Sequence, residues 1–371
     1  MKICYIGEGT SIHVQKWVNY FAGKGHEIHL ISSRFPTDYQ GYDRSIRFHL
    51  LGRLAPRIWV LSRYASAVRW LFQVRGLLNR LKPDVLDTHY ITVHGYLGTF
   101  AGFHPIILTA WGSDVLITPQ KSFFHRLVTR YCLKRADTVV CDSETVQQAL
   151  RKLGTEPDKI RIIYNGIDTE QFNPARRSET LRSGLGTGDG PIVICIRHLS
   201  PAYNVEMLVR AMPLVLKEVP EARFVIGGDG VQRGYLEDLA SSLGAAGSVR
   251  FIGSIPHDEM PDYLASADLY VSTSLSDSTS LSLQEGMASG LAPVVTDLPA
   301  NREWIEDGKN GFIVDPGDIS ALADRIVYLL KNDELRAAFG KTARENVRER
   351  AEYRKEMERV EKIYQELSGK S

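Results

Sequence analysis

The stretch SLSDSTSLSLQEGMASGLAPVVT, residues 274–296, lies between two short apolar runs, Leu269–Ser272 and Ala292–Val295. Both runs have the length and composition of buried β-strands. The residues up to Ser280 include serines and a threonine, which commonly cap the start of a helix. A helix from this point to about Ser289 completes a strand–helix–strand unit. Such units build parallel sheets with helices on both faces.

The same alternation runs along the whole chain. In the first half, apolar runs predict strands at Lys2–Ile6, Glu27–Ser32, Asp84–Thr88, Pro105–Thr109 and Thr138–Cys141. In the second half, further strands are predicted at Pro191–Ile196, Arg223–Gly227 and Val249–Ile252. We therefore predict an α/β protein of two Rossmann-like doubly wound domains facing a central cleft. Ligands of such domains bind near the carboxyl ends of the strands.

The boundary between the domains is predicted within residues 168–190, which are rich in Arg, Ser, Gly and Thr and poor in apolar residues. The expected segments are 1–170, 171–350 and a C-terminal helix at 351–371 that packs back on the first domain. Residues 1–170 contain 22 basic and 14 acidic residues, whereas the remainder contains 23 basic and 30 acidic ones. The two halves are therefore expected to face different partners.

The chain has the features of a cytoplasmic protein. It contains no run of about 18 uncharged apolar residues that would span a membrane. Its start, MKICYIG, is typical of a strand entering a glycine turn rather than of a signal peptide. The cysteines are scattered and lack metal-ligand spacing, so we expect reduced thiols. They are Cys4, Cys132, Cys141 and Cys195.

Two carboxylates flank the helix start in the opening stretch. Asp277 precedes the predicted helix and Glu285 lies within it, eight residues later. A helix start offers free N–H groups and a positive dipole end, which suit a diphosphate. Carboxylates beside it can accept hydrogen bonds from sugar and ribose hydroxyls. The spacing by itself also fits an acidic cap on an ordinary strand–helix unit.

With its neighbours, this stretch resembles the acidic E-x7-E signature of the family-4 retaining glycosyltransferases (glycosyltransferase group 1), which have the GT-B fold. Asp277 replaces the first Glu of that signature, and EGMASGLAPVV from Glu285 continues it closely. Further motifs of the family match in the correct order. They lie at residues 163–172, 225–230, 251–253, 263–268 and 301–318.

The resemblance implies roles for single residues. Glu285 would bind the ribose hydroxyls, and Asp277 the hydroxyls of the transferred sugar. Backbone N–H groups around Ser280, Leu281 and Ser282 would hold the diphosphate, and the backbone near Gly253 would contact the base. Gly7 and Gly9 lie in a loop that is similar to the family's glycine-rich loop, which would let the backbone approach the phosphates or the acceptor. A tight turn between strand and helix is the alternative reading of that loop.

The sequence departs from the family at the usual phosphate-binding Arg and Lys. His198 and Tyr203 align with those positions, and Arg197 lies one place earlier. A leaving diphosphate needs positive charge, and the planar guanidinium suits phosphate. We therefore expect Arg197 to supply the charge, assisted by Tyr203 or Asn204. A surface salt bridge is the alternative role for this arginine.

A second departure concerns the acceptor side. Trp111 stands where the family often has His, in the run TAWGSD that ends at Asp114. An indole cannot transfer a proton, but it can stack on a sugar face. His13 and His89 remain candidates for polar contacts. The acceptor-side candidates are thus His13, His89, Trp111 and Asp114.

Residues 46–82 combine many arginines and large apolar residues with no acidic residue. This composition is typical of a surface that lies on anionic lipid, and it would suit a lipid-linked acceptor at the inner face of the membrane. Core helices with solvated arginines are the alternative. We expect no nucleic-acid partner, because no recognised module is present.

The predicted activity is transfer of a hexose-type sugar from a nucleotide-sugar to a glycan or lipid-linked acceptor in cell-surface polysaccharide or glycoconjugate synthesis. UDP is the expected nucleotide because it is common in the family, and GDP is the alternative. The resemblance implies retention of configuration and no metal; no cofactor is expected, since the nucleotide-sugar is a substrate. Two alternatives stay open. One is a nucleotide-sugar epimerase of similar architecture, and the other is a non-catalytic scaffold.

Overall fold

The computed structural model describes residues 1–52, 59–185, 190–277 and 279–369. The chain forms two compact units. The N-terminal unit contains Met1–Asn165 and Lys355–Ser371, and the C-terminal unit contains Gly166–Arg354. These limits lie a few residues from the segment boundaries expected from the sequence.

The N-terminal unit is built on a parallel sheet of seven strands in the order β3-β2-β1-β4-β5-β6-β7. Its central strands are apolar and buried on both faces, as parallel sheets covered by helices require. The order reverses between β1 and β4, the position where doubly wound sheets bind ligands. The strands are β1 (Lys2–Ile6), β2 (Glu27–Ser32), β3 (Arg47–Leu50), β4 (Val85–His89), β5 (Ile106–Thr109), β6 (Thr138–Cys141) and β7 (Ile160–Ile162).

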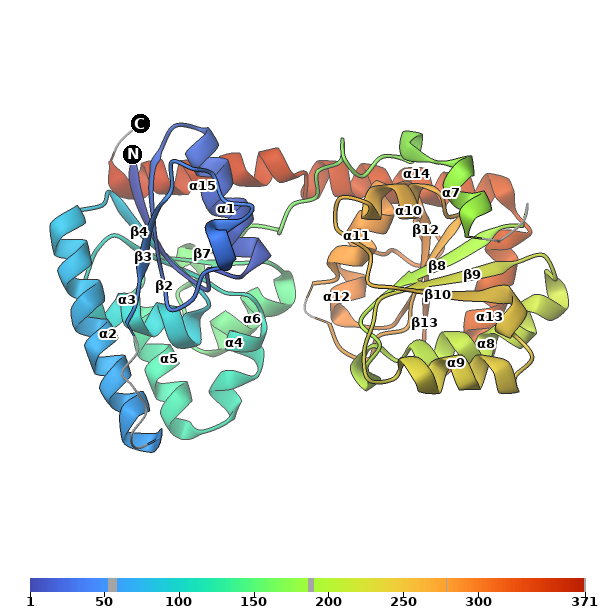
Figure 1. Ribbon diagram of the computed structural model, residues 1–371, viewed down its shortest axis with the longest axis horizontal. Coiled ribbons are helices and arrows are strands. Elements are labelled where there is room, and N and C mark those ends of the chain that lie inside the picture. Colours follow the sequence, from blue (N-terminus) through green and yellow to red (C-terminus); the bar gives the residue numbers. More distant parts are fainter. Residues whose placement is uncertain (53–58, 186–189, 278, 370–371) are drawn as a thin grey trace. The chain divides into compact units, whose positions relative to one another are not determined.

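Helices cover both faces of this sheet (Figure 1). They are α1 (Ile12–Gly23), α2 (Trp59–Leu81), α3 (Tyr96–Ala101), α4 (Ser113–Leu116), α5 (Phe123–Arg135), α6 (Glu144–Lys152) and α15 (Tyr353–Ser368). Helix α3 packs against both α2 and α5. Across the described residues, no helix combines the length and the apolarity needed to cross a bilayer.

Helix α15 joins the N-terminal unit from the far end of the sequence. Its fully buried Tyr364 donates a hydrogen bond of 2.6 Å to the Asp87 carboxylate in β4. The same hydroxyl lies 3.1 Å from the hydroxyl of Tyr5 in β1. Burial, with the nearby Asp87 and Tyr5, raises the pKa of Tyr364 well above its usual value. The phenol therefore keeps its proton and remains the donor to Asp87.

The C-terminal unit repeats the architecture around a parallel six-stranded sheet in the order β10-β9-β8-β11-β12-β13. Here the order reverses between β8 and β11. The strands are β8 (Ile192–Ile196), β9 (Arg223–Gly227), β10 (Val249–Gly253), β11 (Leu269–Ser272), β12 (Ala292–Thr296) and β13 (Phe312–Val314). The helices are α7 (Glu179–Gly184), α8 (Val205–Glu218), α9 (Arg233–Ser242), α10 (Met260–Ala265), α11 (Leu281–Ala288), α12 (Pro299–Arg302), α13 (Ile319–Leu330) and α14 (Asp333–Arg350).

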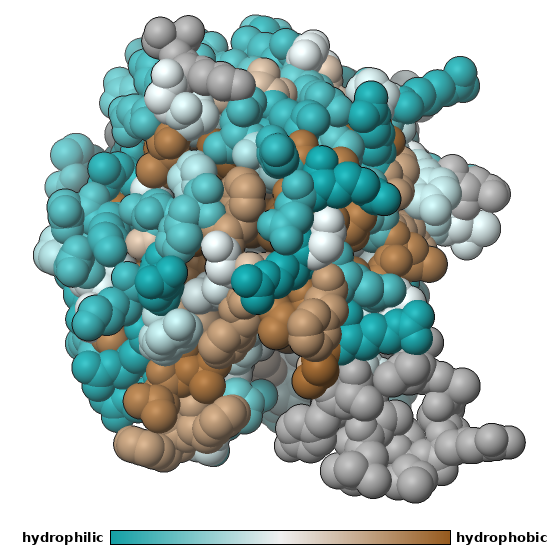
Figure 2. Space-filling view, turned by 90° about the vertical axis from the view of Figure 1, so that its left-hand side faces the viewer, coloured by the Kyte–Doolittle hydropathy of each residue, from teal (hydrophilic) through white to brown (hydrophobic). Residues whose placement is uncertain are grey.

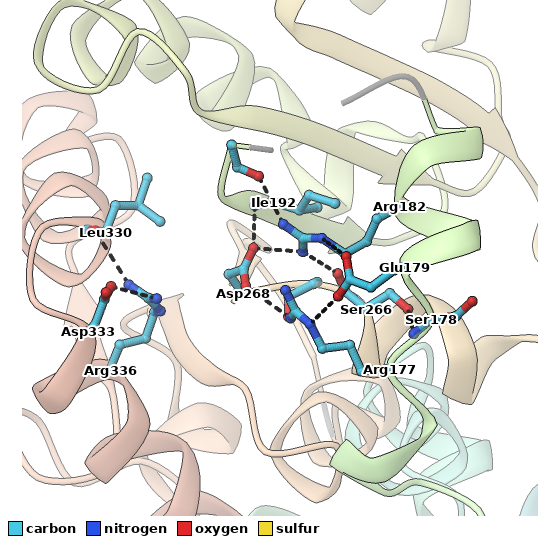
Figure 3. Close-up of polar contacts among 12 residues, drawn as sticks. Arg177, Ser178, Glu179, Arg182, Ile192, Ser266, Asp268, Leu330, Asp333 and Arg336 are labelled. Atoms are coloured by element: carbon cyan, nitrogen blue, oxygen red, sulfur yellow. Dashed lines mark hydrogen bonds and ion pairs between the residues drawn. The ribbon is translucent and has the colours of Figure 1, made fainter. Parts of the chain in front are cut away.

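Residues 168–190, expected as a linker, belong to the C-terminal unit wherever the structure describes them. The buried Arg182 of α7 donates to the Ser266 carbonyl at 2.7 Å and to the Asp268 carboxylate at 2.9 Å (Figure 3). Asp268 also accepts from Arg177 at 3.1 Å and from the Ile192 N–H at 2.7 Å. These bonds attach α7 to the sheet. Breaking them would be costly, because removal of one partner of a buried ion pair leaves the other charge uncompensated.

The structure adds three strands that the sequence pattern did not predict. Strands β3, β7 and β13 have only three or four residues each and lie at sheet edges. Strand β3 falls within residues 46–82, where the composition had indicated a membrane surface. The C-terminal helix expected at 351–371 is observed as α15, and α13 and α14 precede it with breaks at residues 331–332 and 351–352.

Candidate active site

The predicted donor-binding residues of the C-terminal unit gather at the carboxyl edge of its sheet. Arg197 directly follows β8, and Asp277 and Ser280 follow β11. Because β8 and β11 are adjacent where the strand order reverses, these side chains meet at the usual ligand position of the fold.

Arg197 is the centre of this group. Its guanidinium forms an ion pair of 2.8 Å with Asp277, and both side chains are nearly buried. Its Nε donates to the Ser272 hydroxyl at 3.1 Å, and its Nη2 donates to the Ser280 hydroxyl. The guanidinium also lies 5.4 Å from the centre of the Tyr203 ring. The side chain predicted to bind phosphate is therefore held at the start of α11 and is not a surface salt bridge.

Arg197 keeps its charge despite its burial. Burial is the largest single effect and opposes the charged form, but the neighbouring Tyr270 and Asp277 outweigh it, so the pKa of Arg197 is raised. A permanent cation thus lies at the carboxyl edge of the sheet. In a site of low dielectric, such a cation attracts an anion more strongly than in water.

Helix α11 begins beside this cation. The Ser280 side chain caps it by accepting a hydrogen bond of 3.3 Å from the Leu283 N–H. The first N–H groups of a helix have no partner within the helix, and in α11 they belong to Leu281 and the residues that follow. The Ser282 hydroxyl pairs with the Tyr270 hydroxyl at 2.9 Å. The helix start and the guanidinium therefore form one positively polarised surface.

Glu285 lies one turn further along α11 and is nearly buried. Its Oε1 lies 3.6 Å from Nε2 of His257, whose ring packs edge-on against Phe172 at 5.8 Å. His257 was not predicted from the sequence. The sequence did offer a signal for His257. It lies four residues after Gly253, whose backbone was expected to contact the nucleotide base.

Two loop positions complete the carboxyl edge. Asn204 has φ of 45° at the start of α8, and its carbonyl accepts from the Thr273 hydroxyl at 2.8 Å. Gly253 has φ of 74° at the end of β10, and its carbonyl accepts from the Gly228 N–H at 2.7 Å. The left-handed conformation at Gly253 favours glycine.

In the N-terminal unit, the glycine loop follows β1 at the position where the strand order reverses. A Cβ atom on Gly9 would lie 2.4 Å from the Phe35 ring and 2.5 Å from the Arg34 carbonyl oxygen. A Cβ atom on Gly7 would lie 3.0 Å from Val14 and 3.4 Å from His89. The close packing around Gly9 leaves no room for a side chain, and this explains why a glycine occupies that position.

Three acceptor-side candidates form one aromatic cluster. His13 stacks on Trp111 with ring centres 4.7 Å apart, and His89 lies 5.6 Å from Trp111. Trp17 packs edge-on against His89 at 4.9 Å. His13 and Trp111 are half-buried, whereas His89 is buried. Burial, with Lys16 and His89 nearby, lowers the pKa of His13 to about 4, so this imidazole is neutral at pH 7.

The remaining candidate, Asp114, forms hydrogen bonds to the backbone of two segments. Its carboxylate accepts hydrogen bonds from the Ile91 N–H at 2.8 Å and the Trp111 N–H at 3.1 Å. Burial raises the pKa of Asp114 to about 6. Its position therefore fixes the backbone that carries Trp111.

Asp87 was missed by sequence reasoning. It is fully buried in β4, accepts from the Thr109 hydroxyl at 2.8 Å and from Tyr364, and lies 3.7 Å from His89. An acidic residue in the middle of an apolar strand was the signal, because a buried carboxylate needs hydrogen-bond partners.

The described residues contain no group of three or more His, Cys, Asp and Glu side chains placed to hold a metal ion. The cysteines are free and buried. Burial raises the pKa of Cys4 and Cys195 to about 12, which keeps both thiols protonated.

Comparison with known proteins agrees with this architecture. The family described as "Glycosyl transferases group 1" matches residues 177–346, and "Glycosyl transferase 4-like" matches residues 2–143. The N-acetyl-alpha-D-glucosaminyl L-malate synthase of Bacillus anthracis is 27% identical over 352 residues, which cover 93% of this chain and 91% of that protein.

An uncharacterized glycosyltransferase of Methanocaldococcus jannaschii is 30% identical over 382 residues, covering 98% of this chain and 96% of that protein. The crystal structure of Anabaena Alr3699/HepE in complex with UDP has a TM-score of 0.82 at 19% identity, over 99% of this chain and 100% of that chain. The chain belongs to the group 1 glycosyl transferases and has the GT-B fold.

Proposed function

We propose that the chain is a retaining hexosyltransferase that moves a sugar from a UDP-sugar to a glycan or lipid-linked acceptor. It would work in the cytoplasm at the inner face of the membrane, in cell-surface polysaccharide or glycoconjugate synthesis. One observation carries the proposal. A charged Arg197 is held beside the start of α11, where the strand order of the C-terminal sheet reverses.

In the proposed donor complex, Arg197 and the first N–H groups of α11 bind the diphosphate. Glu285 accepts hydrogen bonds from the ribose hydroxyls, and Asp277 accepts them from the transferred sugar. The contact of 2.8 Å between Arg197 and Asp277 places the two binding functions next to each other. This order matches a nucleotide-sugar, in which the diphosphate separates the sugar from the ribose.

The chemical step breaks the bond between the anomeric carbon and the diphosphate oxygen. It forms a bond from that carbon to an acceptor hydroxyl oxygen, whose proton passes to the leaving diphosphate. Negative charge then grows on the leaving diphosphate, and groups already oriented toward it lower the barrier. Arg197 and the start of α11 would stabilise this charge, with Tyr203 and Asn204 close by. No resident metal or cofactor has a role in this proposal.

UDP is proposed as the nucleotide. The solved structure of Anabaena HepE, which shares the fold, is a complex with UDP. The base would lie against the backbone near Gly253, and His257 would orient the Glu285 carboxylate toward the ribose. The alternative nucleotide is GDP, and the titrations described below compare the affinities of the chain for UDP and GDP.

The acceptor is proposed to bind near the His13–Trp111 stack of the N-terminal unit. A half-buried indole beside a neutral imidazole offers an apolar ring face and polar edges to a sugar. The basic segment 46–82 supports a location at the membrane. Its residues 53–58 lie outside the described residues, and its helix α2 exposes Val68 and Phe72 beside Arg69 and Arg75.

Calorimetric titration with UDP, GDP and ADP tests the donor site, and we expect saturable binding of UDP. Incubation with UDP-sugars, followed by NMR of the anomeric proton, tests the reaction. Transfer with retained configuration, also in EDTA, is the expected result. An epimerase would change the free donor without an acceptor, and a scaffold would release no product.

A further inference from the structure

Helix α5 exposes a row of large apolar side chains. Phe123 is 81% exposed, Phe124 70% and Leu127 55%. Tyr131 continues the row one turn later and stacks on the exposed Phe100 of α3 at 5.6 Å. Figure 2 looks onto the N-terminal unit from the left-hand side of Figure 1 and shows hydrophobic side chains at several places on that face, among the hydrophilic ones. Exposed apolar clusters of this kind mark interaction sites.

The exposed row does not belong to the core of the unit. The opposite side of α5 already supplies that core through the buried Thr129, Cys132 and Leu133. A surface helix normally carries one apolar stripe that faces the core and polar residues elsewhere. Helix α5 has a second apolar stripe that faces solvent, so packing within the unit does not account for it.

A row of cations runs beside the apolar row. Arg126, Arg130 and Lys134 are spaced four residues apart, which places them on one side of the helix. All three are exposed. Residues 115–136 contain five Lys or Arg and no acidic residue. Within the part of the chain that the structure describes, none of the three forms an ion pair, so their charge is left for an external partner.

A groove opens at the start of the same helix. It has a volume of about 720 Å³ and is lined by Phe123, Arg126 and Lys152, over apolar walls that include Val115 and Leu153. The two cations lie at an apolar surface, an arrangement that suits an amphiphile with an anionic head. Arginine and lysine both bind phosphate oxygens through charge-assisted hydrogen bonds.

We propose that α5 is a docking surface for an anionic phospholipid membrane. Phe123, Phe124 and Leu127 enter the boundary between headgroups and acyl chains, and the cationic row contacts the headgroup phosphates. An amphipathic helix with a basic row and aromatic residues binds an anionic membrane surface in this way. The groove beside Phe123 accepts one lipid headgroup.

A lipid surface fits better than a second protein. The centre of a protein interface is depleted of charged residues, whereas here an unpaired cationic row follows the apolar row along the helix. Anionic headgroups supply the matching charge continuously over such a length. The inference extends the proposed membrane location, but it names a different helix from α2 and requires no sugar donor.

The test is co-sedimentation of the full chain with vesicles of equal parts phosphatidylcholine and phosphatidylglycerol, compared with phosphatidylcholine alone. We expect binding to the anionic vesicles only, weakened by added salt. The Arg126→Gln/Arg130→Gln variant should bind roughly thirtyfold more weakly, because each cation near an anionic surface contributes about fivefold. Lys217→Gln/Lys341→Gln removes two exposed cations of the C-terminal unit and should change nothing.

The apolar part is tested separately. Phe123→Ser/Phe124→Ser should lower the affinity for anionic vesicles at least tenfold, because the variant loses the free energy gained when two large apolar side chains leave water. Val231→Ser, at an equally exposed apolar position of the C-terminal unit, is the control. Because all four positions on α5 are exposed, circular dichroism should show an unchanged fold.

Three results would overturn the inference. The first is equal binding to both kinds of vesicle, and the second is binding that the α5 variants leave intact. The third is a dimer in solution that Phe123→Ser/Phe124→Ser separates while vesicles do not bind, which would assign the surface to a second copy. UDP titration of the same samples reports the donor site independently, so failure of vesicle binding leaves the proposed transfer reaction standing.

Discussion

The Nη2 atom of Arg197 lies 2.8 Å from Oδ2 of Asp277, and the two side chains are only 9% and 12% exposed. Such a pair holds two opposite charges away from water at the carboxyl edge of the sheet. Each charge depends on the other, because an isolated buried ion is costly. The proposed donor site therefore has its charges arranged before any ligand enters.

Arg197→Ala should lower the free energy of unfolding by about 3–5 kcal/mol, because it leaves Asp277 without its counter-ion. Urea unfolding measures the change. The control is Arg210→Ala, which removes an exposed pair of 2.7 Å with Glu206 and should cost less than about 1 kcal/mol. Equal losses in the two variants would show that the Arg197–Asp277 pair has no special energetic weight.

Glu285→Ala should weaken UDP binding by about 1–3 kcal/mol, because ribose hydroxyls would lose a buried acceptor. Calorimetry on the variant gives the difference directly. Glu306→Ala, at an exposed glutamate of the same unit, should leave the affinity unchanged. If the two variants bind UDP equally well, Glu285 is not a ribose ligand.

His13→Phe should remove part of the acid sensitivity of folding. The folded chain holds the pKa of His13 at about 4, below its ordinary value of 6.5. Between these pH values the unfolded chain takes up a proton that the folded chain does not, so stability falls as the pH drops. The loss is complete near pH 4 and amounts to at most about 3 kcal/mol.

Urea unfolding of the wild type and of His13→Phe at pH 7 and pH 4 measures this loss of stability. The phenylalanine keeps a ring against Trp111 but cannot be protonated. We expect a smaller drop in stability for the variant across this window. Parallel curves for the two proteins would mean that protonation of His13 in the folded chain is not disfavoured.

Gly9→Ala should destabilise the chain by about 1–3 kcal/mol, since the added methyl would collide with the Phe35 ring and the Arg34 carbonyl. Gly23→Ala is the matched control. Its Cβ would have no neighbouring atom within 4 Å, and its helical position favours alanine by about 0.5–1 kcal/mol. Thermal unfolding should therefore shift in opposite directions for the two variants.

Sequence patterns predicted the central strands well, because strands that are buried on both faces consist of nearly continuous apolar residues. The predicted bounds of β1, β2, β6, β9 and β11 agree with the structure. The edge strands β3, β7 and β13 were missed. Each pairs on one side only and is short, so its conformation depends on the neighbouring strand more than on its own residues.

The site was predicted in part. Arg197, Asp277 and Ser280 were each singled out from the sequence, and the structure brings them into contact. Their mutual geometry was not predictable, because it depends on how β8 and β11 lie next to each other. The contact of Asp87 with Tyr364 was also beyond sequence reasoning, since 277 residues separate them. The roles of these side chains stay predictions until donor binding is measured.

The bond between Tyr364 and Asp87 has a consequence for the order in which the protein matures on the ribosome. The strands of the N-terminal unit are synthesised first, yet the phenol that partners the buried Asp87 is added 277 residues later. Until then, the nascent N-terminal unit must keep this carboxylate hydrated or bound elsewhere. Its final closure therefore follows synthesis of the entire C-terminal unit, so the first unit to be made is the last to be completed.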